Sequence, residues 1–279
     1  MSFLSFMRRA KSILTNCGGR NARTNRYAGR LVASLPDEEF VAICHCLIFE
    51  NGTRKTTERC RNLGILQDKL NGRLNESKSR LSVLDAGASI GLDSLATIDW
   101  LQSRHSLQSY VLGDLYTHIL IDENGGFVFD QDGGLLQVKG RSFFTAMNFS
   151  FQYGFQKYIN LWNFVRTSRL KRTLAGRSAP DSSVLVPLIH PSLKAAPFSG
   201  VVSSQRVDVF GKISGQYDLI VCMNLLVRRY FDTNEIAKGI SNLADALAPG
   251  GVLVAGANDG GVVFARSSDG NTLSMLEKW

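Results

Sequence analysis

The hydrophobic pattern of the chain changes near residue 80. Before it, apolar residues at helical spacing follow Pro36, and the acids that come next fit a first helical turn, so residues 37–80 are predicted to form a helical extension. After it, short apolar runs alternate with amphipathic segments, which is typical of a mostly parallel sheet with helices on both faces. The sequence therefore predicts an α/β core over residues 81–279.

The core opens with a strand, a turn of small residues and a helix. Leu81–Ala86 is the strand, the turn contains Gly87, Ser89 and Gly91, and residues 92–101 have helical spacing. A second strand over residues 109–112 ends at Asp114. Parallel sheets bind ligands beyond the carboxyl ends of their strands, and small residues let a ligand approach the backbone. We therefore expect the candidate site at this turn.

The alternation of short apolar runs and amphipathic segments returns near residue 206 and continues to residue 276. The pattern predicts strands at Arg206–Phe210, Tyr217–Cys222 and Val252–Ala255, a helix at Asn234–Leu247, a turn at Pro249–Gly251 and a closing hairpin of residues 262–265 and 272–276.

Residues 116–200 interrupt this pattern as a mixed insertion. Short strands are predicted at 118–121, 127–129 and 135–138, the first two as a hairpin, and an apolar run follows at 184–189. Nine aromatic residues, Trp162 among them, lie between Phe143 and Phe164. Such aromatic residues suit contacts with sugar faces, acyl chains or bases, and they are equally suited to form the insertion's own core.

Two segments carry the net charge of +8. Residues 1–36 contain seven Arg and Lys and no acid, and residues 133–180 contain eight and no acid. Such segments meet anions such as phosphate, phospholipid or nucleic acid, or form solvated faces. Residues 1–36 are a basic arm that fits a short amphipathic helix, a disordered arm or an organelle transit peptide, and not a secretory signal.

Composition narrows the class of protein further. No apolar run is long enough to span a membrane, and five cysteines without paired spacing fit a reducing compartment. The expectation is a cytoplasmic protein whose basic arm allows a peripheral membrane contact. Cys44-His-Cys46 with Cys60 is too weak a pattern for a metal site, and we expect none.

The turn after Asp85 does not match the common nucleotide-binding motifs. A dinucleotide fingerprint needs three glycines, but Ser89 and Leu92 occupy two of those positions, and no Gly-Lys-Ser/Thr follows a glycine turn.

Four motifs in order make the chain resemble the class I S-adenosylmethionine-dependent methyltransferases, whose core is Rossmann-like. They are Val83-Leu-Asp-Ala-Gly-Ala-Ser-Ile-Gly91, Asp114 after the second strand, Gln216-Tyr-Asp-Leu-Ile-Val-Cys-Met-Asn-Leu-Leu226, and Leu247-Ala-Pro-Gly-Gly-Val-Leu-Val254. The resemblance covers residues 80–115 and 205–279, about half of the chain.

This resemblance implies S-adenosylmethionine as cofactor and assigns roles to residues. The turn of Asp85, Ala86, Gly87, Ser89 and Gly91 would line its amino-acid end. Asp114 would accept hydrogen bonds from the ribose hydroxyls. Asp208 would approach the adenine, and Asn224 would face the methyl group.

The sequence says less about the methyl acceptor than about the cofactor. Family members that methylate amino groups of bases or of glutamine often carry Asn/Asp-Pro-Pro-Tyr, where this chain has Asn224-Leu-Leu-Val, which counts against adenine or cytosine amino groups as acceptors. We expect O-methylation. The stretch from Tyr217 to Asp232 also looks like the chemotaxis-receptor glutamate methyltransferases, with Met223 in place of their Arg. A protein carboxyl (glutamate) methyltransferase of the chemotaxis type is therefore the alternative function.

In the family that the chain resembles, insertions placed like residues 116–200 cover the acceptor, so the resemblance implies a substrate-covering insertion. Because this one is basic and aromatic, we expect an anionic or amphiphilic acceptor, such as a small molecule, a glycan or a lipid-linked molecule, with nucleic acid less favoured. His118, His190 and Tyr230 are candidate catalytic residues, the histidines as general bases, and Arg229 and Trp162 are candidate acceptor contacts. Two classes of protein are alternatives to an enzyme: a non-catalytic binding module that retains the fold, and a membrane-surface adaptor that acts through the basic arm.

Overall fold

The structure is a computed structural model of the 279-residue chain. It describes residues 44, 47, 49, 62–74, 80–122, 127–139, 144–146, 174, 176, 178–194, 198, 200–228, 230–257 and 259–279. The chain divides into two compact units, one of residues 1–56 and 118–191 and the other of residues 57–117 and 192–279. Each is described by itself.

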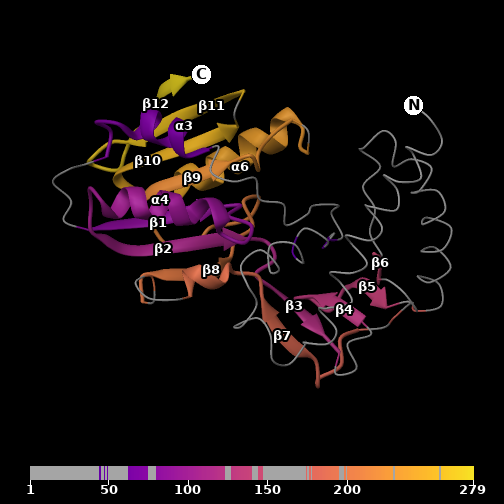
Figure 1. Cartoon of the computed structure of the whole chain (residues 1–279). Coiled ribbons are helices and arrows are strands. Elements are labelled where there is room, and N and C mark those ends of the chain that lie inside the picture. The colour runs from indigo at the N-terminus through magenta and orange to yellow at the C-terminus, as the bar shows by residue number, and fades with distance from the viewer. Residues whose placement is uncertain are drawn as a thin grey trace, which may run out of the picture. The chain divides into compact units, whose positions relative to one another are not determined.

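The unit of residues 57–117 and 192–279 is built around a seven-stranded sheet (Figure 1). Its strands, in spatial order, are β12 (Leu273–Lys278), β11 (Gly260–Arg266), β10 (Leu247–Ala257), β9 (Tyr217–Met223), β1 (Leu81–Ala86), β2 (Leu107–Asp114) and β8 (Val202–Arg206). The five strands from β10 to β8 are parallel, and β11 and β12 follow as an antiparallel hairpin. The sheet is therefore mostly parallel, and its closing hairpin is confirmed.

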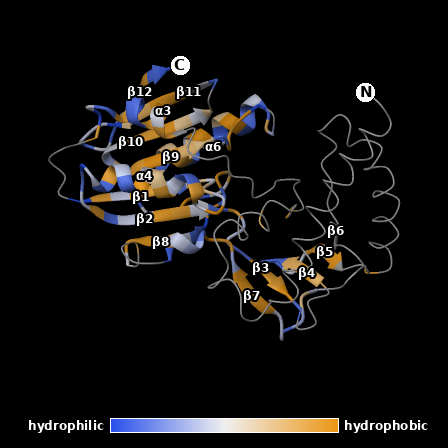
Figure 2. Cartoon of the chain, viewed as in Figure 1, coloured by the Kyte–Doolittle hydropathy of each residue, from blue (hydrophilic) through white to orange (hydrophobic). Residues whose placement is uncertain are grey.

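Helices cover both faces of this sheet. Leu84, Ile220 and Leu253 share one face and pack with Leu243 and Ala244 of α6 (Thr233–Asp245). The other face carries α4 (Leu92–Gln102) and α3 (Asn62–Leu70). The central strands β1, β9 and β10 are almost fully buried, which is why they read as continuous apolar runs (Figure 2).

A capping box starts α6. The Asp232 side chain accepts hydrogen bonds from the amides of Asn234 and Glu235 at 2.8 and 2.9 Å, and the Glu235 carboxylate accepts the Asp232 amide at 2.8 Å. These bonds satisfy amides that the helix itself leaves unpaired. The acids after β9 thus have a local structural role.

The predicted strand Arg206–Phe210 is wrong, because β8 ends at Arg206. Val207 and Val209 are buried and alternate with exposed Asp208, which imitates a strand. The backbone instead turns: the amides of Phe210 and Gly211 donate to Asp208 Oδ1 and O at 2.9 and 3.0 Å. Residues 207–216 then link β8 to β9, across the positions of β2 and β1, without a helix.

The predicted turn at Pro249–Gly251 lies inside β10 as an irregularity. Leu247 pairs with Tyr217, but the next pair is Val252 with Leu219, so residues 248–251 stand outside the regular register. Gly250 takes a φ of 75° there, a conformation that glycine adopts without steric cost.

The other unit contains an antiparallel sheet. Its strands, in spatial order, are β6 (Phe144–Ala146), β5 (Leu135–Lys139), β4 (Phe127–Asp130), β3 (His118–Ile121) and β7 (Val184–Pro187). The predicted β3–β4 hairpin is present. Buried Asp122 and Asp130 stabilise its turns, since Asp122 accepts the Phe127 amide at 2.7 Å and Asp130 accepts the Gly134 amide at 2.7 Å. A short 3-10 helix, Pro191–Leu193, follows β7.

No helix in the described part of the chain is long and apolar enough to cross a membrane. The basic arm, residues 1–36, lies outside the described residues.

Candidate active site at the β1–α4 turn

The turn between β1 and α4 bonds to the end of β2. The amides of Gly87 and Ala88 both donate to Gly113 O, at 2.7 and 3.2 Å. The Ser89 amide donates to Asp114 Oδ2 at 2.9 Å, and the Gly91 amide to Ala88 O at 2.8 Å. These four amides are therefore engaged inside the protein and do not form a phosphate cradle.

The glycines of the turn are explained by the protein's own packing. Gly87 and Gly91 have φ values of 79° and 78°. A Cβ at Gly87 would lie 2.9 Å from Leu225 Cδ2, and one at Gly91 would lie 2.5 Å from Leu193 Cδ1. Both sites thus require glycine for conformation and for space. The glycines alone are not evidence for a ligand.

Ser89 provides the stronger signal. It has a φ of 58°, which is uncommon outside glycine, asparagine and aspartate. Among the described residues, its Oγ is buried and lacks a hydrogen-bond partner. Buried hydroxyls without a partner are costly and rare in folded proteins. A ligand with a polar group at this turn would satisfy that oxygen.

Asp85 faces the α4 side of the sheet at the end of β1. Its Oδ2 accepts hydrogen bonds from Ser94 Oγ of α4 at 2.6 Å and from the Tyr110 hydroxyl of β2 at 2.9 Å. Burial raises the pKa of Asp85 to about 6, although both hydrogen bonds oppose the shift. Asp85 as a whole residue is half-buried, while burial of its carboxyl group dominates the shift.

Two further carboxylates lie near Asp85. Asp93 in the first turn of α4 and Asp114 at the end of β2 both repel its charge and contribute to its raised pKa. Asp93 also places a negative charge where a helix N-terminus would otherwise favour an anion. The turn therefore favours a ligand with cationic and hydroxyl groups over a pyrophosphate.

Asp114 lies at the end of β2 and is bonded to two amides of this edge of the sheet. Its Oδ1 accepts the Tyr116 amide at 3.1 Å and its Oδ2 the Ser89 amide. A carboxylate accepts hydrogen bonds from hydroxyl groups such as those of a ribose. The Asp114 carboxylate as acceptor and the unpaired Ser89 hydroxyl are polar groups of the kind that the ribose and amino-acid parts of S-adenosylmethionine require.

The remaining predicted site residues of this unit lie near the carboxyl ends of the strands. Asn224 directly follows β9 with a φ of 60°, and its amide donates to Gly256 O at 2.7 Å. Asp208 is exposed in the turn after β8. Tyr230 is 46% exposed, with its ring edge-on to Phe231. Ala86 is buried at the end of β1, and its methyl side chain offers no polar group to a ligand.

The two histidines belong to the other unit. His118 begins β3, and His190 is buried just after β7, 2% exposed. Arg229 and Trp162 lie outside the described residues. Within the described residues, no group of three or more His, Cys, Asp or Glu side chains is arranged to hold a metal ion.

Sequence reasoning missed the partners that shape the turn. Ser94 and Tyr110 bind Asp85, and Leu193 and Leu225 fill the space beside the glycines. Ser94 lies nine residues after Asp85, and the sequence offers only the hint of a polar residue on the buried face of a helix.

Comparison with known proteins gives no family assignment. No family model matches the chain, and no curated protein matches it. Among solved structures, the chain is similar to the N-methyltransferase NodS from Bradyrhizobium japonicum WM9 in complex with S-adenosyl-L-homocysteine, at 16% identity, with 74% of this chain and 61% of that chain covered and a TM-score of 0.30.

Two other solved structures are similar at the same level. They are magnesium protoporphyrin IX methyltransferase from Synechocystis PCC 6803 with bound SAM (13% identity, 85% and 74% covered, TM-score 0.31) and PKMT2 from Rickettsia typhi (11% identity, 65% and 21% covered, TM-score 0.28). The chain thus spans less than two thirds of NodS. Likenesses this distant establish no activity for this chain.

Proposed function

We propose that the chain is an S-adenosylmethionine-dependent methyltransferase that binds its cofactor at the β1–α4 turn. The observation that carries the proposal is the unpaired, buried Ser89 hydroxyl beside Asp114, in a turn surrounded by carboxylates. Three acids and internally bonded amides disfavour a phosphate ligand. They favour the sulfonium, ammonium and ribose hydroxyl groups of this cofactor.

The cofactor supplies an electrophilic methyl group, which an acceptor atom attacks in line with the breaking carbon–sulfur bond. The protein has to hold the acceptor in contact distance and exclude water. Asp114 is proposed to hold the ribose and Ser89 the amino-acid end, with Asn224 at the end of β9 on the methyl side. Asp208 is proposed to approach the adenine.

We propose O-methylation of an anionic or amphiphilic acceptor, either a small molecule, a glycan or a lipid-linked molecule. The support is compositional: residues 133–180 contain eight basic residues and no acid, in a segment rich in aromatic side chains. Tyr230, Arg229 and Trp162 are proposed acceptor contacts. His118 or His190 is proposed to take the acceptor proton.

Calorimetric titration of the full chain with S-adenosylmethionine, S-adenosylhomocysteine and NAD tests the proposal. The first two are expected to bind and NAD is not. Asp114→Asn should weaken cofactor binding at least about tenfold, since it removes a charge that accepts hydrogen bonds. Asp99→Asn is the matched control, because Asp99 is an exposed acid on α4.

Failure of both adenosyl compounds to bind would overturn the proposal. Equal weakening by Asp114→Asn and Asp99→Asn would show that the site is elsewhere. Binding without any turnover against a panel of anionic lipids, glycans and small acids would favour the non-catalytic module over the enzyme.

A further inference from the structure

The Asp85 carboxyl group is buried without a cationic partner. Its Oδ2 accepts hydrogen bonds from the hydroxyl groups of Ser94 and Tyr110, and it forms no ion pair with any residue in the described part of the chain. Both donors are neutral, so they satisfy lone pairs of the carboxylate but do not balance its charge. Because an ionised carboxylate is costly to take out of water without a cation, such a group tends to hold its proton.

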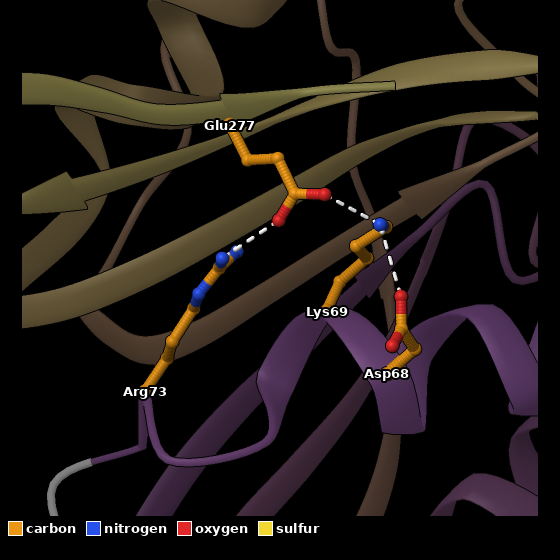
Figure 3. Close-up of polar contacts among 4 residues, drawn as sticks. All are labelled: Asp68, Lys69, Arg73 and Glu277. Carbon is orange, nitrogen blue, oxygen red and sulfur yellow. Dashed lines mark hydrogen bonds and ion pairs between the residues drawn. The ribbon is translucent and has the colours of Figure 1, made fainter.

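Glu277 of the same unit shows how a paired acid behaves. Its carboxylate accepts hydrogen bonds from Lys69 of α3 at 2.5 Å and from Arg73 at 2.6 Å (Figure 3). These hydrogen bonds from cations hold the pKa of Glu277 below its ordinary value, whereas burial raises the pKa of Asp85 to about 6. The contrast shows what Asp85 lacks, which is a positive charge beside its carboxyl group.

The titratable groups around Asp85 are acids or neutral groups. Strand β1 lies between β2 and β9, and Ser94 brings α4 against it. Asp93 of α4 and Asp114 of β2 repel the charge of Asp85, while Tyr110 of β2 and Cys222 of β9 face it. The pKa of Tyr110 is raised well above its ordinary value and that of Cys222 to about 12, chiefly by burial, so neither is charged at neutral pH. The groups that act most strongly on Asp85 thus include no cation.

The position of Asp85 brings this uncompensated acid to the proposed cofactor turn. Asp85 is the last residue but one of β1, and Gly87 follows the strand. The residue is half-buried, and its Oδ1 accepts no hydrogen bond from the described residues. A cation that reached Oδ1 would supply the missing charge, and the attraction would be stronger there than in water. It would therefore favour the ionised form of Asp85.

We propose that Asp85 carries a proton in part of the ligand-free molecules and releases it when the ammonium group of the cofactor's amino-acid end binds beside it. This inference rests on the proposed function, because it requires S-adenosylmethionine to bind at the β1–α4 turn. The O–H bond of the carboxylic acid breaks, the proton passes to the buffer, and the carboxylate pairs with the ammonium group. Cofactor affinity should therefore fall as the pH drops below about 6.

Calorimetry in several buffers counts the protons released on binding, because each released proton adds the ionisation enthalpy of the buffer to the measured heat. Titration of the full chain with S-adenosylhomocysteine should release about half a proton per bound molecule at pH 6, and the release should fall toward zero at pH 7. The amino group of the ligand is almost fully protonated at pH 6, so the release there reports on the protein.

Two variants assign the proton to its residue. Asp85→Asn should abolish the release at pH 6, whereas Asp99→Asn, which removes an exposed acid of α4, should leave it unchanged. Tyr110→Phe keeps the acid and removes one hydrogen bond that lowers its pKa, so the release should persist to a higher pH. Denaturant unfolding shows beforehand that each variant is folded. A variant that only disturbed packing would not move the pH at which the proton is released.

Methylthioadenosine tests the ligand side on the unaltered protein, because it has the adenosine and the thioether but no ammonium group. It should release no proton at pH 6. Release by S-adenosylhomocysteine that Asp85→Asn abolishes supports the inference. Binding of S-adenosylhomocysteine at pH 6 without release, release that Asp85→Asn leaves unchanged, or equal release by methylthioadenosine overturns the inference and leaves the proposed function standing. Absence of binding by both S-adenosylmethionine and S-adenosylhomocysteine at pH 6 and 7 overturns the proposed function itself, and the inference with it.

Discussion

Ser89 and Asp114 are joined across the carboxyl edge of the sheet: the Ser89 amide donates to Asp114 Oδ2 at 2.9 Å, while the hydroxyl of the same serine is buried without a partner. One residue thus has its backbone fixed and its side chain unsatisfied. The Ser89 hydroxyl is therefore the group at this turn through which ligand binding can be tested.

Ser89→Ala should have opposite effects on stability and binding. Removing a buried, unpaired hydroxyl should raise the free energy of unfolding of the ligand-free protein by about 1 kcal/mol. Losing a hydrogen bond to the cofactor should weaken S-adenosylmethionine binding by about three- to tenfold. Denaturant unfolding and calorimetry measure the two effects.

Ser183→Ala is the control for that experiment, because Ser183 Oγ is also buried and unpaired but lies in the other unit. It should raise stability without changing cofactor affinity. A fall in affinity with both variants, or with neither, would contradict the role given to Ser89.

Asp85→Asn should change how stability depends on pH. The pKa of Asp85 rises from 3.8 to about 6 on folding, so the folded state binds this proton more tightly than the unfolded state. Its contribution to stability is complete below pH 3.8 and is lost as pH rises to about 6. The loss amounts to about 3 kcal/mol, at 1.36 kcal/mol per pH unit.

Denaturant unfolding at several pH values between 4 and 7 checks this. The difference in unfolding free energy between Asp85→Asn and the original chain should grow in favour of the variant as pH rises, because the amide cannot ionise. The amide oxygen can still accept the hydrogen bonds of Ser94 and Tyr110. A difference that stays constant with pH would show that Asp85 is not destabilised by burial.

Gly91→Ala should destabilise the protein by about 1–3 kcal/mol. The added Cβ would lie 2.5 Å from Leu193 Cδ1, and the φ of 78° is unfavourable for alanine. Gly64→Ala is the matched control, because nothing lies within 4 Å of its Cβ position in α3. Better helix propensity should there stabilise the protein by about 0.5–1 kcal/mol. Thermal unfolding should show a lower Tm for Gly91→Ala and a higher Tm for Gly64→Ala.

The Cys222 thiol should be unreactive in the folded protein. Burial raises its pKa to about 12, and the thiolate is the reactive form. Iodoacetamide at pH 8, followed by peptide mass spectrometry, should modify Cys222 only after denaturant is added. Modification of the native protein at the rate of a small thiol would refute this burial.

The local pattern of the sequence was sufficient where an element is defined by its own residues. The strand–turn–helix unit from Leu81 to Gln102 and the strand ending at Asp114 follow from apolar runs and small residues, and the structure confirms them. The pattern failed at Arg206–Phe210, since alternating burial is not unique to strands. There the Asp208 side chain and carbonyl take the amides that a strand would use.

Contacts between distant segments could not be read from the sequence. The partners of Asp85 depend on the β1–β2 register, which places Tyr110 opposite Val83 and its hydroxyl near the end of β1. The need for glycine at position 87 depends on Leu225, more than a hundred residues away. Such relations arise from packing and are set only once the sheet is assembled.

The position of residues 118–191 between β2 and β8 has a consequence for how the chain is made. β1 needs β9 as its neighbour, so this sheet cannot close until Met223 has left the ribosome, 109 residues after Asp114. At the usual 5–20 residues per second, this takes about 5–20 s. During that interval one edge of the apolar strand Leu81–Ala86 lacks its partner, so the nascent chain exposes an unpaired strand edge of the kind that promotes aggregation.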